Sequence, residues 1–270
     1  MLGKLMKHEF KATGKVMLPL YLGVAALTAM TKLMLMLNGF LTTVGEEGVL
    51  RENVFTMVIS RMLLFANILM LFGLIVVTVI FAIMRFYKNL LGDEGYLMFT
   101  LPVTPAQHLV SKAVTSLCFT LGSGILVVGA GFVLSSSPTE AAELLNGFFA
   151  GPPLYIWFLV AFTGILWILC GYLMLYFSMG MGAQFGSNRL LGSILTYVVV
   201  GIILQFAAVI GVVSAAGIFA SSKELGWMNQ LEPYSAAGML LAVLCVGSIL
   251  LSTLFFFITR YLLSKRLNLN

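Results

Sequence analysis

The chain has 270 residues, of which 60% are hydrophobic and 9% charged; its formal net charge is +5 and its mean hydropathy is +1.06. A soluble domain carries about a quarter charged residues, so a water-soluble globule is excluded and the bilayer is the expected solvent. In such a chain the distribution of Lys and Arg around the spans indicates the orientation in the membrane, and the net positive charge does not indicate nucleic-acid binding. The composition predicts an all-α membrane protein with a single transmembrane domain over residues 1–270, the lipid bilayer as a partner and no nucleic acid.

The first fifteen residues separate apolar and basic side chains onto two stripes of one helix. This pattern is typical of a basic amphipathic helix that lies in the membrane interface with its lysines facing anionic headgroups; a solvated charged tail is the alternative. The clean separation favours an interfacial helix over residues 1–15. The apolar stripe holds Leu2, Leu5, Met6 and Phe10, and the basic stripe holds Lys4, Lys7, His8, Lys11 and Lys15.

Six apolar runs follow, each long enough at about 1.5 Å per residue to cross a hydrocarbon layer of about 30 Å. Pro19 falls in the first turns of the first run, where a missing N–H is tolerated. The segment 137–140 (Ser-Pro-Thr-Glu) has the pattern of a helix start and predicts a short surface helix. The loop 219–238 is expected to hold another short helix or to dip back into the interface. The predicted spans cover about residues 16–37, 56–84, 110–134, 154–178, 190–217 and 237–259.

Six spans place both termini on the same side of the membrane. Eleven of the 15 Lys and Arg residues lie on that side and four on the other. Because basic residues are enriched in cytoplasmic loops, both termini are expected in the cytoplasm. The eleven are Lys4, Lys7, Lys11, Lys15, Arg85, Lys88, Lys112, Arg189, Arg260, Lys265 and Arg266, and the four are Lys32, Arg51, Arg61 and Lys223.

No catalytic constellation emerges from the sequence. It contains no G-x-x-x-x-G-K-[ST], H-E-x-x-H or G-x-S-x-G. Glu46, Glu47 and Arg51 fit the E-E-x-x-x-R pattern of intramembrane prenyl-protein proteases. That chemistry needs histidines deep in later spans, whereas only His8 and His108 occur, both near the cytoplasmic face. The three cysteines lie far apart in apolar runs. We therefore expect no enzyme, no catalytic residue, no metal site, no disulfide and no cofactor.

Few polar groups lie within the predicted spans. Lys32 and Arg61 fall toward outer ends, where they either snorkel to headgroups or line an outward cavity for an anionic or amphipathic cargo. Asn67 and Gln205 lie deeper, and either form hydrogen bonds between helices or contact the cargo. Small residues recur every four positions in the fifth span and predict a seam for close helix packing, formed by Ala207, Gly211 and Ala215.

The stretch 85–112 is the one long polar segment between spans on the predicted cytoplasmic side. Asp93 can cap a short helix that begins at Glu94 and ends before Pro102. The segment 104–107 (Thr-Pro-Ala-Gln) then has the pattern of a second helix start. Four large apolar residues in a row lie in the first helix, and they either dip into the interface or fill a groove on a partner. They are Tyr96, Leu97, Met98 and Phe99.

Three segments carry a resemblance to a known family: KLMKHEFKATGK near the N-terminus, NLLGDEGYLMFTLPVTPAQHLVSK between spans 2 and 3, and ITRYLLSKRLNLN at the end. With the six-span layout, they resemble the membrane subunits of bacterial ATP-binding-cassette exporters of the type-2 permease family. The resemblance implies that the middle segment is a coupling helix, seated in a cleft of a separate ATPase subunit. Carried over to residues 92–104, the implied contacts are Asp93, Glu94, Tyr96, Leu97 and Phe99.

The resemblance also implies the assembly: two permeases, alike or different, on two ATPase subunits that bind the ATP, in a bacterial cell membrane. ATP binding would close the ATPases, and spans 2 and 5 of the two permeases would then move against each other. The cargo would be a peptide, a lipid or a drug-like molecule. The alternative interpretation is a non-catalytic membrane protein that acts in interaction, immunity or assembly.

Overall fold

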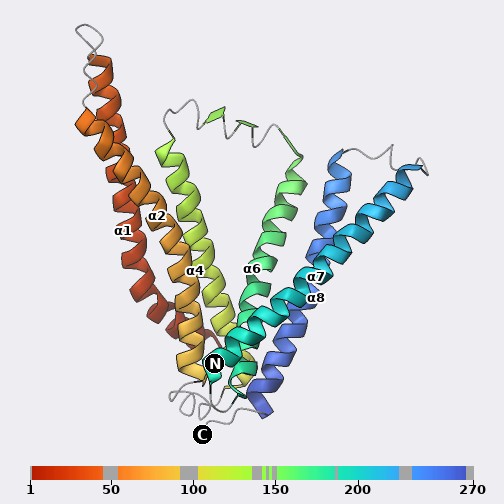
Figure 1. The fold of residues 1–270 in the computed structure, drawn as a ribbon. Coiled ribbons are helices and arrows are strands. Elements are labelled where there is room, and N and C mark those ends of the chain that lie inside the picture. The colour runs from red at the N-terminus through yellow and green to blue at the C-terminus, as the bar shows by residue number, and fades with distance from the viewer. Residues whose placement is uncertain are drawn as a thin grey trace. The chain divides into compact units, whose positions relative to one another are not determined.

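The computed structural model describes residues 2–44, 54–91, 103–135, 142–143, 146–147, 151–185, 188–224 and 233–265. Within these residues the regular structure is helical and contains no strand (Figure 1). Six helices are long and apolar enough to cross a membrane. The predicted all-α, six-span architecture is therefore confirmed. The predicted helix start at 137–140 lies outside the described residues, and of the residues that follow it 142–143 and 146–147 are described as helical.

Each helix extends beyond the span predicted for it. Hydropathy identifies only the apolar run, whereas a helix continues until its backbone hydrogen bonds are capped or broken. The predicted loop 219–238 is shorter as a result, because one helix reaches Glu224 and the next begins at Pro233. The elements are α1 (Leu2–Val44), α2 (Val54–Phe86), the π-helix η2 (Tyr87–Leu91), α4 (Pro105–Leu134), α6 (Leu154–Gly182), α7 (Arg189–Glu224) and α8 (Pro233–Lys265).

The contacts between Cα atoms group the chain into two compact units. The first comprises Met1–Ala82 and Val114–Ala150, and the second comprises Ile83–Ala113 and Gly151–Asn270. Helices α2 and α4 contribute to both units. The single domain expected over 1–270 stays a prediction, and each unit is described by itself.

The first unit is held together by hydroxyl and amide groups that line the contacts between its helices. At one end of the α1–α2 contact, Asn38 accepts a hydrogen bond from Thr56 at 3.1 Å and donates one to Ser60 at 3.3 Å. Toward α4, the Tyr21 hydroxyl donates to the Phe119 carbonyl at 2.7 Å. The Thr78 and Ser123 hydroxyls lie 2.8 Å apart. Such pairs fix helix register in a bilayer, where apolar contact alone has no solvent-driven preference for protein over lipid.

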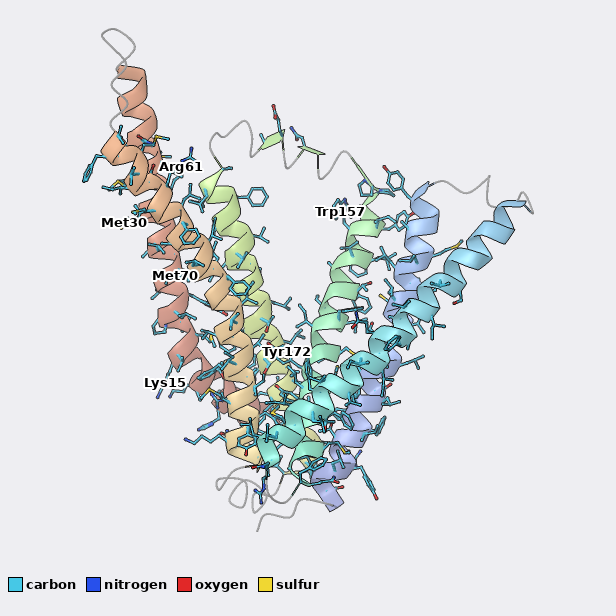
Figure 2. The ribbon with its side chains drawn as sticks, viewed as in Figure 1. Lys15, Met30, Arg61, Met70, Trp157 and Tyr172 are labelled. Atoms are coloured by element: carbon cyan, nitrogen blue, oxygen red, sulfur yellow. The ribbon has the colours of Figure 1, made fainter. Side chains whose placement is uncertain are left out.

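Helix α1 has 43 residues, about 65 Å at 1.5 Å per residue, which is twice the hydrocarbon thickness. It runs without interruption through the expected interfacial segment 2–15 into the span. Pro19 therefore lies inside the helix rather than in its first turns. Figure 1 shows α1 bending near its N-terminal end, and Figure 2 shows Lys15 beside the bend. Pro19 lacks the N–H that would bond the Lys15 carbonyl, and its ring crowds that carbonyl, which accounts for the bend.

The side chains before the bend follow the predicted two stripes. Those of the basic stripe are exposed, while those of the apolar stripe are half-buried. The Phe10 ring lies 5.8 Å from that of Phe119 on α4. Glu9 shares the covered face and is only 3% exposed, which the pattern did not predict. Residues 2–15 are thus helical with exposed basic side chains, and a separate amphipathic helix in the membrane interface stays a prediction.

In the second unit α6 and α8 form a closely packed parallel pair. Contacts recur along the two helices with residue numbers rising together: Thr163 Oγ1 lies 2.8 Å from Cys245 Sγ, and the rings of Phe177 and Phe255 are 5.5 Å apart. Beyond them, Leu262 packs onto Gly180. The pairing explains why both helices have buried residues although each is apolar on almost every side.

Helix α7 begins directly after α6 and then diverges from it (Figure 1). The turn between them is tight. A Cβ atom added to Gly182 would collide with the backbone of Ser193, so only glycine fits at this position. Within Arg189–Gly211 of α7, none of the 18 consecutive residues of highest hydropathy is buried. The exposed apolar side chains of this helix are available for contact with lipid or with a neighbouring helix.

Candidate functional site

The candidate site is the junction between α2 and α4, because the expected coupling segment connects these helices. Residues 92–102 lie outside the described residues, and with them all five predicted contacts, Asp93, Glu94, Tyr96, Leu97 and Phe99. The structure does describe both ends of the connection, which are η2 on one side and the start of α4 on the other. The hydrogen bonds and packing of these two ends show how each is joined to the neighbouring helices.

The end that leads into α4 has the predicted capping box. The Thr104 hydroxyl accepts a hydrogen bond from the Gln107 backbone N–H at 3.4 Å, and the Gln107 side-chain oxygen accepts one from the Thr104 N–H at 3.2 Å. Helix α4 begins at Pro105, the first helical position. Both hydrogen bonds satisfy donors that a helix start would otherwise leave unpaired. The predicted start of this helix is therefore confirmed.

The end that leaves α2 widens into the π-helix η2 over Tyr87–Leu91. Single π-turns are uncommon, shift the hydrogen-bond ladder by one residue and frequently occur at functional sites. Phe86 just before it and Leu90 within it are both 0% exposed. The widened turn is therefore anchored by two large apolar side chains rather than projecting freely.

Both ends of the connection are joined to α6 through one side chain, Tyr176. Its ring stacks on that of Phe86, with centroids 4.2 Å apart and planes within 7°. Its hydroxyl lies 3.5 Å from the Lys112 carbonyl of α4, where it donates a long hydrogen bond. Tyr172, one turn earlier (Figure 2), has its ring 6.2 Å from that of Tyr176. A displacement of either end must therefore move α6 as well, because closely packed interiors transmit strain.

Basic side chains are unusually well buried at this junction. His108 is 1% exposed and Lys112 is 3% exposed. The Lys112 ammonium lies 3.4 Å from the Arg85 carbonyl, to which it donates at the C-terminal end of α2. A cation is favourable there, because the last carbonyls of a helix carry partial negative charge. Lys112 thus connects α4 to the end of α2, next to the aromatic contact with α6.

Sequence reasoning identified this junction but missed the residues that hold it. Tyr172 and Tyr176 were not singled out, and their spacing of four residues was the available signal, since it places both rings on one helix face. Nothing in the sequence indicated the π-turn at Tyr87–Leu91.

The four polar residues predicted within spans have different environments. Lys32 donates a 2.6 Å hydrogen bond to the Ser135 carbonyl at the end of α4, a cap that was not foreseen. Asn67 is 1% exposed and donates to the Thr28 hydroxyl at 3.1 Å, so its predicted role between helices is confirmed. The remaining two are exposed: Arg61 on α2 and Gln205 on α7.

The predicted seam has no partner helix within the described part of the chain. Ala207 and Gly211 are exposed, and a Cβ atom added to Gly211 would meet nothing within 4 Å. The side chain of Ala215 lies outside the described residues. The role of this seam in helix packing stays a prediction.

The described residues contain no group of three His, Cys, Asp or Glu side chains that could hold a metal ion. Comparisons with family models, with curated proteins and with solved structures give no match. The class follows from the fold itself: six apolar helices long enough to cross a bilayer define a multi-pass membrane protein.

Proposed function

We propose that the chain is the membrane permease subunit of an ATP-driven exporter of the ATP-binding-cassette type, paired with a separate ATPase subunit. One observation carries the proposal: the connection between α2 and α4 is fastened at both ends to α6 through Tyr176. A purely connecting loop does not need two anchored ends. A segment that receives a push from a partner does, because the push must reach the helices that span the bilayer.

Under this proposal residues 92–104 form the coupling region, whose helix docks on the ATPase. ATP binding and hydrolysis move this helix, and η2 and the first turns of α4, as far as Lys112, pass the displacement to α6. The chain carries no P-loop of its own, in agreement with an ATPase on another chain. The termini and the coupling helix lie in the cytoplasm of a bacterial cell, on the side where basic residues concentrate.

The exposed face of α7 supports a second permease subunit in the assembly. Gln205 is exposed in the middle of this helix and makes no hydrogen bond within the described part of the chain. An amide without a partner in hydrocarbon costs several kcal/mol, on the order of 4. A second chain on the face of α7 that holds Ala207 and Gly211 would cover Gly211. Gln205 lies about 120° away around the helix, so its amide would need a separate neighbour. Gly211→Leu is expected to lower the dimer fraction and leave each chain folded, because nothing in the described part of its own chain lies within 4 Å of an added Cβ.

A pull-down from gently solubilised native membranes tests the proposal. The tagged wild-type chain is compared with Phe99→Asp and with the matched control Phe99→Leu, which keeps an apolar side chain. An ATPase is expected to copurify with the wild type and the leucine variant and to be lost with the aspartate variant, since a charge in an apolar cleft is unfavourable.

The rival function is a membrane protein that acts only by binding other membrane components. It predicts that no ATPase copurifies from membranes in which the chain remains folded, and that result would refute the exporter proposal. Transport at the wild-type rate in Phe99→Asp, with normal insertion, would refute the coupling site while leaving the association with an ATPase intact.

A further inference from the structure

The exposed face of α2 carries a shallow, open hollow around a cation. It is lined by Arg61 and four apolar side chains of the same helix. Two of these point strongly outward, with Met62 68% and Phe65 65% exposed. The lining residues are Met57, Val58, Arg61, Met62 and Phe65.

Arg61 makes no hydrogen bond or ion pair within the described part of the chain. Lys32, by comparison, donates to the Ser135 carbonyl at 2.6 Å. Arg61 is exposed, and at the level of a bilayer an arginine flanked by apolar side chains is stabilised where its guanidinium reaches a polar partner. Its five N–H groups are arranged for two parallel hydrogen bonds to a carboxylate or a phosphate. The described residues supply neither, and the surroundings of the helix can supply an acceptor of this kind. Three glutamates that precede α2 in the sequence lie outside the described residues: Glu46, Glu47 and Glu52.

Hydrogen bonds in the first unit fix the depth of Arg61. Asn38 on α1 bonds Ser60 on α2, and Thr28 bonds Asn67, so the α1 segment between them faces residues 60–67 of α2. Lys32 lies in that α1 segment and caps the end of α4. Arg61 is therefore near the level at which α4 ends. Figure 1 shows α1 and α2 continuing past that end, and Figure 2 shows Arg61 on the upper part of α2.

Sequence length gives the same depth. The next charged residue after Arg61 on α2 is Arg85. The charge-free run between them is about 35 Å long at 1.5 Å per residue, slightly more than the roughly 30 Å hydrocarbon layer. Arg61 thus lies where the hydrocarbon meets the headgroups, which is the depth of the lipid phosphates.

We propose that this hollow binds an anionic phospholipid of the surrounding bilayer, with its phosphate paired to the Arg61 guanidinium and an acyl chain lying along Met62 and Phe65. The flexible thioethers of Met57 and Met62 suit an acyl chain of variable conformation. A phospholipid is the one component that presents a phosphate and a hydrocarbon tail together at this depth. The site does not depend on what the chain transports.

The test is native mass spectrometry of the purified full chain, titrated with phosphatidylglycerol or with phosphatidylcholine of the same acyl chains. Arg61→Gln is expected to weaken phosphatidylglycerol binding at least about tenfold, the loss of one charge-assisted bidentate contact. Arg61→Lys keeps the positive charge but cannot form two parallel hydrogen bonds, so its affinity for phosphatidylglycerol should lie between those of the wild type and Arg61→Gln. Arg260→Gln, which removes another exposed arginine, is the matched control and should change binding less than about twofold.

Four outcomes would overturn the proposal. Equal weakening by Arg61→Gln and Arg260→Gln would mean general attraction of headgroups to arginine. Equal affinity for the two lipids would mean that the site does not select the net negative charge of an anionic headgroup. Displacement by inorganic phosphate alone would mean that the acyl chain does not contribute to recognition. A change in the number of chains per particle, with lipid binding unaffected, would mean that a second copy covers this face. Circular dichroism of each variant checks that the helices remain folded.

Discussion

Replacing Tyr176 by alanine should destabilise the second unit by about 3 kcal/mol. The side chain is 0% exposed. Its removal leaves a void on the order of 100 Å³, which costs roughly 2.4 kcal/mol at about 24 cal/mol per Å³. Loss of the stack on Phe86, with centroids 4.2 Å apart, adds about 0.5–1.5 kcal/mol. Tyr176→Phe keeps the ring and gives up the long hydrogen bond to Lys112, so it should cost under about 1 kcal/mol.

The assay is reversible unfolding in mixed micelles of a mild detergent and sodium dodecyl sulfate, followed by circular dichroism. Tyr155→Ala is the matched control, because this tyrosine is on the same helix but 49% exposed. Its substitution should cost well under about 1 kcal/mol. The reasoning is refuted if Tyr176→Ala is as mild as Tyr155→Ala. A double-mutant cycle with Phe86→Ala should give a coupling energy of at least about 0.5 kcal/mol; no coupling would mean that the stack contributes nothing.

Three further substitutions test separate features. Gly182→Ala should prevent native packing of the α6–α7 turn, because its Cβ collides with Ser193. Gly164→Ala is the control and should be tolerated, because the space around Gly164 is open. Equal yields of folded protein for the two variants would contradict this. Asn67→Leu should change the free energy of unfolding by less than about 1 kcal/mol. The substitution loses one hydrogen bond, but it also removes a buried Oδ1 that has no partner, and the two effects offset each other. A larger loss of stability would show that the amide has a second partner. Thr104→Ala should cost about 1 kcal/mol and speed hydrogen exchange in the first turn of α4, and unchanged exchange would count against the cap.

The features that sequence predicted well are those set by local composition. Six apolar runs gave six helices, and the segment 104–107 gave a capping box because its four residues satisfy one another's backbone groups. The role of Asn67 between helices followed from the cost of a buried amide in hydrocarbon. These inferences needed no knowledge of which helix lies beside which.

The missed features depend on contacts between distant residues. Lys32 caps α4 through Ser135, 103 positions away, and no pattern around Lys32 indicates that acceptor. Tyr176 was missed for a related reason: α6 is apolar on nearly every side, so its periodicity does not identify the buried face. Pro19 was misplaced because the amphipathic segment and the span form one helix, and a change in hydropathy does not require a break in the backbone.

The parallel pairing of α6 and α8 has a consequence for biogenesis. The ribosome makes α6 first, and its neighbour α8 becomes available only after the whole of α7 has been synthesised and has crossed the bilayer in the opposite direction. Until then Thr163 lacks Cys245, and the Phe177 ring lacks Phe255. The contacts between these two helices therefore form only once the last helix has entered the membrane.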